Sequence, residues 1–408
     1  NGAGKYQRGS KHTFIGVSAG FGHSSSPYSN GTENTAIGAY ALINSRASQS
    51  YTTAVGAHAG YYTTGSYNTF MGWKAGYGGT TSAPFSSGQN NTALGYQALT
   101  GFTTGGDNVA LGYQAGSNMT TGNRNIAIGY QAKAGSVGYD NIVLGKGAGA
   151  GFTSGYKNIV MGNQAAAGHN GIQNVVIGHQ ANGGGSTGVD NTIIIGYQAA
   201  YNINSADADG TIAIGKSAGG SITSGIGNTA IGYEAGYNNI TGGYNTLLGY
   251  QAGYNLLTDN NVAIGWQALY KIGDSAGGGH GENNVAIGPG AMAGGDDTDG
   301  NNTGYKNVAI GTSTLGGATR SSDGDAFTAY YNIAIGHEAG KSVTTGASNV
   351  LLGSLAGDAI TTKTGIIAIG LGAAGAISTT GDYTIAIGHG AMGGAQIGDG
   401  NIAIGYQS

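Results

Sequence analysis

Side chains that could do acid–base or metal chemistry are sparse in this sequence and do not gather into a site. Eight histidines and 19 aspartates and glutamates are spread over 408 residues, and cysteine is absent. Without cysteine there are no disulfides and no thiolate metal sites. The histidines lack the paired spacing of metal ligands, and no Ser–His–Asp grouping stands out. Because catalysis needs a concave, preorganised pocket built from such groups, the sequence predicts that the protein is not an enzyme.

Acidic residues concentrate in three successive long insertions of the sequence. They are Asp274 and Glu282, then Asp296, Asp297 and Asp299, then Asp323 and Asp325. Carboxylate and carbonyl oxygens are the usual ligands of Ca²⁺, so Asp296, Asp297 and Asp299 form a candidate calcium site. The spaced aspartates of a calcium-binding loop are missing, and this favours solvated loops over a metal site.

Two segments fit the glycine pattern of a dinucleotide-binding loop, Gly370–Gly375 and Gly388–Gly393. That fingerprint needs a helix directly after the loop and an acidic residue about twenty positions later. Both segments are followed by another β-like stretch instead. Apart from the candidate calcium ion, no cofactor is expected.

Aromatic residues recur at a fixed place, one residue after a recurring glycine. The main ones are Trp73, Tyr96, Tyr113, Tyr130, Tyr233, Tyr250 and Trp266. If they face outward, they form stripes suited to stacking on sugar rings, which makes them candidate carbohydrate-binding residues. The alternative is that they cover an edge of the fold or a seam between subunits, and the amphipathic rings of tyrosine and tryptophan favour it.

Five Asn-x-Ser/Thr sequons are candidate glycosylation sites. They begin at Asn30, Asn90, Asn118, Asn239 and Asn301. A chain this rich in Asn and Thr contains several sequons by chance. The recurring Thr-rich corners would also suit O-glycans if the source glycosylates its proteins.

These motifs lie on a short repeat that covers the chain. The repeat reads Asn, then Thr, Val or Ile, then usually Ala, then an aliphatic residue or Met, then Gly, and it occurs 22 times between Gly16 and Gly405. Most copies are 16 to 19 residues apart. We therefore expect a single repeat domain over residues 1–408. Longer insertions fall near 21–33, 77–90, 270–283, 293–306 and 316–331.

Short apolar runs rich in Val, Ile and Thr and bounded by Gly and Asn predict strands. With 85 glycines, helices are not competitive. Each repeat is then one coil of an all-β, parallel β-solenoid of about 22 coils. Side chains alternate across a strand, and we assign the face of Thr229 and Ile231 to the core and that of Ala230 to contact with another surface. The Asn and Gln columns are expected to form amide ladders along the coils.

Composition excludes several classes of protein. Only 34 of 408 residues are charged, and the net charge is −4, so nucleic-acid binding is not expected. No apolar stretch is long enough for a transmembrane segment. Without a signal peptide or an initiator Met, the sequence fits a mature or excised segment. A coil of seventeen residues has a thin core, so we expect a homo-oligomer that packs through the small Ala and Gly column.

The repeat resembles that of a known family. NTAIG at 228–232, NVAIG at 261–265 and NIAIG at 401–405 resemble the repeats of trimeric autotransporter adhesin heads, and NTALGYQAL at 91–99 is similar to repeats of phage tail fibres. The resemblance implies a left-handed β-roll that forms a trimer, with the small column near the subunit contacts. The matching residues are Ala36, Ala93, Ala127, Ala230 and Ala263.

The expected function is that of an extracellular fibrous protein of a cell surface or virion. It would be a rod-like structural or adhesive segment of a surface adhesin or tail fibre, with surface glycans as candidate ligands. The alternative is a purely structural filament whose subunits stack head to tail without a specific ligand. An ice- or surface-binding solenoid is a third interpretation, weakened because the Thr before Ala becomes Val or Ile in most coils from 109 to 214.

Overall fold

The computed structural model describes most of the chain. The described residues are 2–22, 30–43, 49–79, 85–133, 135–168, 170–185, 188–203, 205–273, 281–294, 302–316, 327–375, 381–394 and 398–408. The chain divides into two compact units, Asn1–Ile195 and Gly196–Ser408. Part of each predicted insertion lies outside the described residues.

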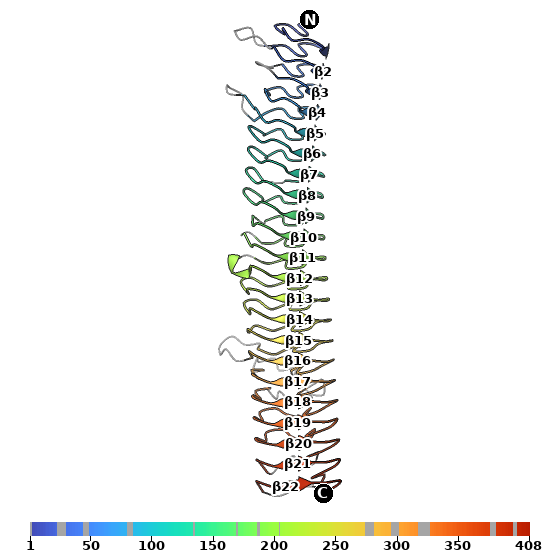
Figure 1. Ribbon diagram of the computed structural model, residues 1–408, viewed down its shortest axis with the longest axis vertical. Helices are drawn as coiled ribbons and strands as arrows, with labels where there is room; N and C mark the ends of the chain where they lie inside the picture. Colours follow the sequence, from blue (N-terminus) through green and yellow to red (C-terminus); the bar gives the residue numbers. More distant parts are fainter. Residues whose placement is uncertain are drawn as a thin grey trace. The chain divides into compact units, whose positions relative to one another are not determined.

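Each unit is a stack of coils with one short strand per coil (Figure 1). The first unit contains β1 (Thr13–Ile15), β2 (Thr35–Ile37), β3 (Thr53–Val55), β4 (Thr69–Met71), β5 (Thr92–Leu94), β6 (Val109–Leu111), β7 (Ile126–Ile128), β8 (Ile142–Leu144), β9 (Ile159–Met161), β10 (Val175–Ile177) and β11 (Ile193–Ile195). The second contains β12 (Ile212–Ile214), β13 (Thr229–Ile231), β14 (Thr246–Leu248), β15 (Val262–Ile264), β16 (Val285–Ile287), β17 (Val308–Ile310), β18 (Ile333–Ile335), β19 (Val350–Leu352), β20 (Ile367–Ile369), β21 (Ile385–Ile387) and β22 (Ile402–Ile404). The described residues include no α-helix, only a 3₁₀ turn, η1 (Ala206–Ala208).

Within each unit, every strand pairs in parallel with the strand of the next coil. The register follows the repeat: in the pairing of β6 with β7, Val109 faces Ile126 and Leu111 faces Ile128. The predicted all-β, parallel β-solenoid is therefore confirmed.

The repeat glycine is fixed by the close approach of successive coils. Gly129 has a φ of +130°, which side-chain-bearing residues rarely adopt, and a Cβ atom there would lie 2.7 Å from the carbonyl oxygen of Gly145. Most other repeat glycines meet the glycine of the next coil in the same way, as Gly112 does with Gly129. No side chain fits at this position, which explains why all 22 copies keep glycine.

The assignment of the two strand faces was wrong. Ala230 is fully buried, whereas Thr229 and Ile231 on either side of it are only partly buried. The same holds for the other alanines of that column, Ala36, Ala93, Ala127 and Ala263. The coil turns back so soon after the three-residue strand that its interior holds a methyl group more readily than a larger side chain, and the aliphatic side chains point outward.

Larger residues enter this inner column where the coil makes room elsewhere. Phe70 is fully buried because Gly76, six residues later, leaves the space that its ring fills. Leu247 is buried in the same way against Gly253, where an added Cβ would lie 2.7 Å from a Leu247 methyl carbon. Conversely, the buried Leu99 occupies that later position in the coil whose inner residue is Ala93. In these three coils, a large residue at one of the two positions is accompanied by a small residue at the other.

Buried asparagines form the predicted ladder along the coils. Asn125 donates from Nδ2 to the Gly138 carbonyl at 2.8 Å, and its backbone N–H donates to Oδ1 of Asn108 at 3.0 Å. Its own Oδ1 accepts the backbone N–H of Asn141 at 3.0 Å. The amide therefore satisfies buried backbone groups of the adjacent coils, which makes the column part of the scaffold.

Candidate functional site

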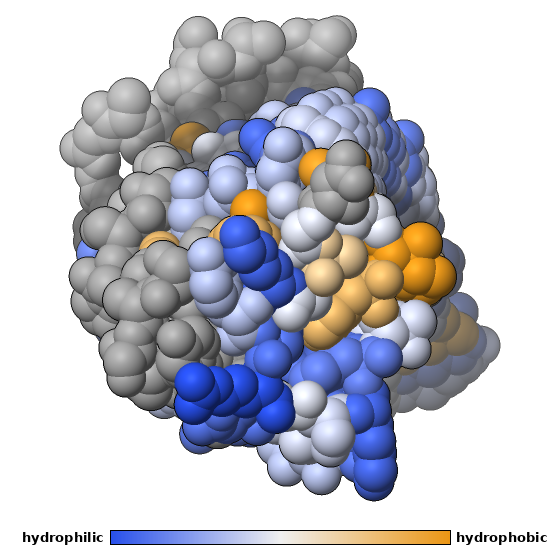
Figure 2. All heavy atoms as spheres, turned by 90° about the horizontal axis from the view of Figure 1, so that it is seen from above, coloured by the Kyte–Doolittle hydropathy of each residue, from blue (hydrophilic) through white to orange (hydrophobic). Residues whose placement is uncertain are grey.

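The outward side of the strands presents an uncharged apolar surface. We define the aliphatic face of a unit as the first and third residues of its strands, all of which are Thr, Val, Ile, Leu or Met. Several are strongly exposed, including Leu94 at 46% in the first unit and Leu248 at 45% in the second. Figure 2 shows apolar side chains gathered on one side of the visible end of the molecule. A monomer rarely leaves such a continuous apolar surface in water.

The predicted aromatic column is real, but its rings stack on one another. Ring centroids are 4.7 Å apart between Trp73 and Tyr96, 4.9 Å between Tyr96 and Tyr113, and 5.0 Å between Tyr113 and Tyr130. The last two pairs are almost parallel, with interplanar angles of 4° and 6°. Because the faces of Tyr96 and Tyr113 are covered on both sides, these rings present edges rather than faces to a sugar.

The second unit carries a similar column. Tyr233 and Tyr250 stack with centroids 5.0 Å apart and an angle of 6°, and Trp266 is half exposed in the next coil. Lys216 occupies the same position between two coils, with Nζ 6.0 Å from the ring centroid of Tyr197 and 5.2 Å from that of Tyr233. The column is therefore a mixture of ring stacking and cation–π contacts.

A glutamine ladder lies on the coil surface beside the first aromatic column. Gln114 donates from Nε2 to Oε1 of Gln97 at 2.8 Å, and Gln131 donates in the same way to Gln114 at 2.8 Å. These side chains are partly or fully exposed, but their amides bond along the stack. The predicted ladder is confirmed, and much of its hydrogen-bonding capacity is used between coils.

A group of rings that the sequence did not predict as a unit surrounds Tyr77. The centroid of Tyr77 lies 5.2 Å from that of Tyr61 and 5.1 Å from that of Tyr62. Burial, with a smaller contribution from Tyr62, raises the pKa of Tyr77 to about 12. Burial also lowers the pKa of His58, whose ring is 5.3 Å from Tyr61. Both side chains are therefore neutral at pH 7, which suits packing rather than proton transfer.

The ion pair between Arg124 and Asp140 is largely exposed on the coil surface. Arg124 Nε lies 2.7 Å from Oδ1 of Asp140, one coil away. The hydrogen bond from Arg124 lowers the pKa of that carboxyl group. Exposed pairs of this kind contribute little to stability because water and salt screen them.

The sequons fall in different environments. Asn30, Asn90 and Asn118 are exposed, although the Asn90 amide donates to Oδ1 of Asp107 at 3.0 Å. Asn239 is fully buried, and neither polar atom of its amide has a hydrogen-bond partner among the described residues. Its burial is incompatible with glycosylation of the folded coil. Asn301 lies outside the described residues.

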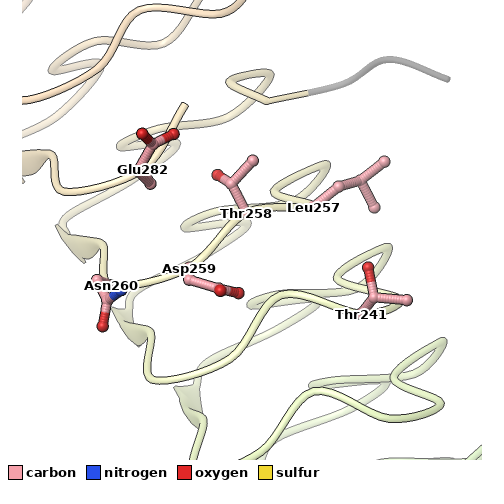
Figure 3. Close-up of a pocket in the computed structure, with 6 residues that line it drawn as sticks. All are labelled: Thr241, Leu257, Thr258, Asp259, Asn260 and Glu282. Carbon is pink, nitrogen blue, oxygen red and sulfur yellow. The ribbon is translucent and has the colours of Figure 1, made fainter. Parts of the chain in front are cut away.

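The candidate calcium ligands Asp296, Asp297 and Asp299 also lie outside the described residues. Glu282 lines an open depression of about 390 Å³ together with Thr241, Leu257, Thr258, Asp259 and Asn260 (Figure 3). Asp259 is held to the preceding coil, since its Oδ1 accepts the Gly243 N–H at 2.7 Å. In the parts of the chain that the structure describes, no three His, Asp or Glu side chains are close enough to bind a metal ion together.

Comparison with protein-family models and with curated proteins finds no match to this chain. Among the described residues there is also no helix with the length and apolar character needed to cross a membrane. Among the surface features of the described residues, the aliphatic face recurs in every coil of both units. The sequence pattern identified the residues of the aliphatic face, but we expected them inside the coil.

Proposed function

We propose that this chain is a structural segment of a fibrous, rod-like assembly, and that copies of it associate through the aliphatic face. The observation that carries the proposal is the absence of any charged residue from the first and third positions of the strands in both units. An exposed face that stays apolar over so many coils marks an interaction site. Contact with the identical face of another copy is the simplest way to bury it.

The size of the face supports self-association. At about 4.8 Å per strand, the eleven strands of one unit extend about 50 Å, and their two outward columns are about 7 Å apart. Stable interfaces bury about 800 Å² per partner. The two columns of one unit outline about 350 Å², so the faces of both units are needed to approach that area.

Adhesion is supported less well than a structural role. The Gln amides bond to one another, and the inner tyrosines of the column cover each other's faces. These groups therefore have reduced capacity for a glycan. The extracellular setting, on a cell surface or virion, and trimeric assembly rest on the resemblance of the NTAIG-type repeats to adhesin heads and tail fibres.

The molecular mass in solution tests the proposal. The informative variant is Leu94→Lys with Leu111→Lys, which places two charges on the aliphatic face. The matched control is Thr104→Lys with Thr121→Lys, which adds the same charge at exposed corners of the same coils. Sedimentation equilibrium is expected to show an oligomer for the wild type and the control, and a monomer for the face variant.

Circular dichroism of all three proteins checks that the coils remain folded. A monomeric wild type over the whole accessible concentration range contradicts the proposal, as does dissociation by the corner variant alone.

A further inference from the structure

Exposed tyrosines stack in register between successive coils, and their outer edges are open to solvent. Tyr96, Tyr113 and Tyr130 are 42%, 41% and 48% exposed. Their centroids are only 4.9 and 5.0 Å apart, and the rings are nearly parallel. Each phenol therefore has another phenol beside it on the adjacent coil and an edge that faces water.

We propose that these stacked tyrosines are a modification site, at which hydrogen peroxide and a haem peroxidase join neighbouring rings of one chain as dityrosine. Each of two phenols loses one hydrogen atom, and one H₂O₂ is reduced to two waters. The two phenoxyl radicals form a C–C bond between carbons ortho to their oxygens. The two ortho protons then move to the phenoxyl oxygens and restore both phenols.

Position favours coupling within the stack. Fixing two reactants side by side replaces a bimolecular encounter with an intramolecular step, and the effective concentration rises by orders of magnitude. Parallel rings must tilt toward each other to form the bond, and side chains more than 40% exposed have room to do so. The product is a covalent link between coils, formed by the single chain whatever its assembly.

The chain contains its own reference for an unstacked tyrosine. Tyr383 is 68% exposed, so an oxidant reaches it at least as easily as it reaches Tyr130. Its ring lies beside Gly365 of the preceding coil, and no aromatic ring stacks on it within the described residues. Exposure without stacking should leave Tyr383 dependent on encounters between different molecules.

Peptide mapping of the full chain tests the proposal. Cleavage after Lys74, Arg124 and Lys133 gives peptides 75–124, which contains Tyr113, and 125–133, in which Tyr130 is the only tyrosine. After treatment with peroxidase and H₂O₂, mass spectrometry is expected to show these two peptides joined with the loss of two hydrogens. The joined species should be lost in Tyr113→Phe and in Tyr130→Phe, which keep the ring but remove the phenol, and retained in Tyr96→Phe.

An isotope experiment separates coupling within a chain from coupling between chains. Labelled and unlabelled protein are mixed before oxidation, and the label content of the joined peptide is measured. Joined peptides with uniform labels support the proposal. Mixed labels in statistical proportion overturn it, as does the absence of the joined species or coupling at Tyr383 that is as fast as at Tyr130.

Discussion

The inner and outer columns of each strand are one residue apart in the sequence, and the inner residues are the smaller ones. In a usual protein core, the larger aliphatic residues are the buried ones. The inner column is mostly alanine and fully buried, as at Ala127 and Ala230, whereas the outer columns carry Ile, Leu, Val, Met and Thr and remain partly exposed. At Phe70 and Leu247, where the inner residue is large, a glycine six residues later compensates, as Gly76 does for Phe70.

This difference shows that space, rather than hydrophobicity, decides which side of the strand points inward. A coil with a three-residue strand encloses little volume, so a small side chain gives the close packing that protein interiors require. The larger aliphatic residues then lie on the outside of the coil, where the single chain leaves them partly exposed. Under the proposed function, the outer columns specify assembly more than the fold of the coil.

The largest expected effect is the difference in stability between a charge on the inner column and the same charge on the outer column of one strand. Ala230→Asp buries a carboxylate with no cation to pair with it, and we expect a loss of more than about 4 kcal/mol in the free energy of unfolding. Ile231→Asp places the same charge on the partly exposed outer column, where we expect a loss below about 1 kcal/mol. Urea denaturation of the two variants, at a concentration at which the protein is monomeric, measures the difference. Equal losses would show that both columns are buried in the isolated chain.

Replacing a repeat glycine tests how closely successive coils approach at the residue after the strand. Gly129→Ala requires a side chain at a φ of +130° and against the backbone of Gly145, and we expect it to cost about 3 kcal/mol or more. The control is Gly147→Ala, at a φ of +62° with only a Gln164 carbon 3.8 Å away, and it should cost about 1 kcal/mol. Thermal unfolding distinguishes them, and similar costs would mean that the coils can move apart.

The sequence predicts the period, the strand positions and the amide ladders because each depends on residues that recur at fixed spacing. Asn125 and Gln114, for example, form hydrogen bonds with the equivalent residues of the preceding coil. The side of the strand that is buried could not be predicted from periodicity, since Ala230 and Ile231 both fit an apolar surface. The available signal was the glycine that stands six residues after each of two large residues in the small column. Gly76 follows Phe70 and Gly253 follows Leu247, and both glycines leave space inside the coil. The edge-on presentation of Tyr113 depends on how rings stack between coils, which spacing alone does not determine.

The smallest expected effect is a change in the free energy of unfolding on replacing one of two buried asparagines of the second unit. Asn245 accepts the backbone N–H of Asn261 at 2.9 Å and donates to the Thr258 carbonyl at 2.8 Å, whereas Asn239 is buried with neither amide atom bonded. In the adjacent coils, the position of Asn239 is occupied by Ile222 and Leu256, both fully buried. An unsatisfied buried polar group costs about 1–3 kcal/mol, so Asn239→Leu should raise the free energy of unfolding by about 1–2 kcal/mol.

The matched variant Asn245→Leu has the same change in size and polarity but removes an amide that bonds to the backbone. It leaves the Asn261 N–H and the Thr258 carbonyl without that partner, and we expect it to lower the free energy of unfolding by about 3 kcal/mol. Chemical denaturation of both variants gives the signs directly. If Asn239→Leu also destabilises the protein, then either the space around residue 239 is too small for leucine or the Asn239 amide of the wild type is solvated. The smaller Asn239→Val variant separates these two causes, because valine relieves only steric crowding.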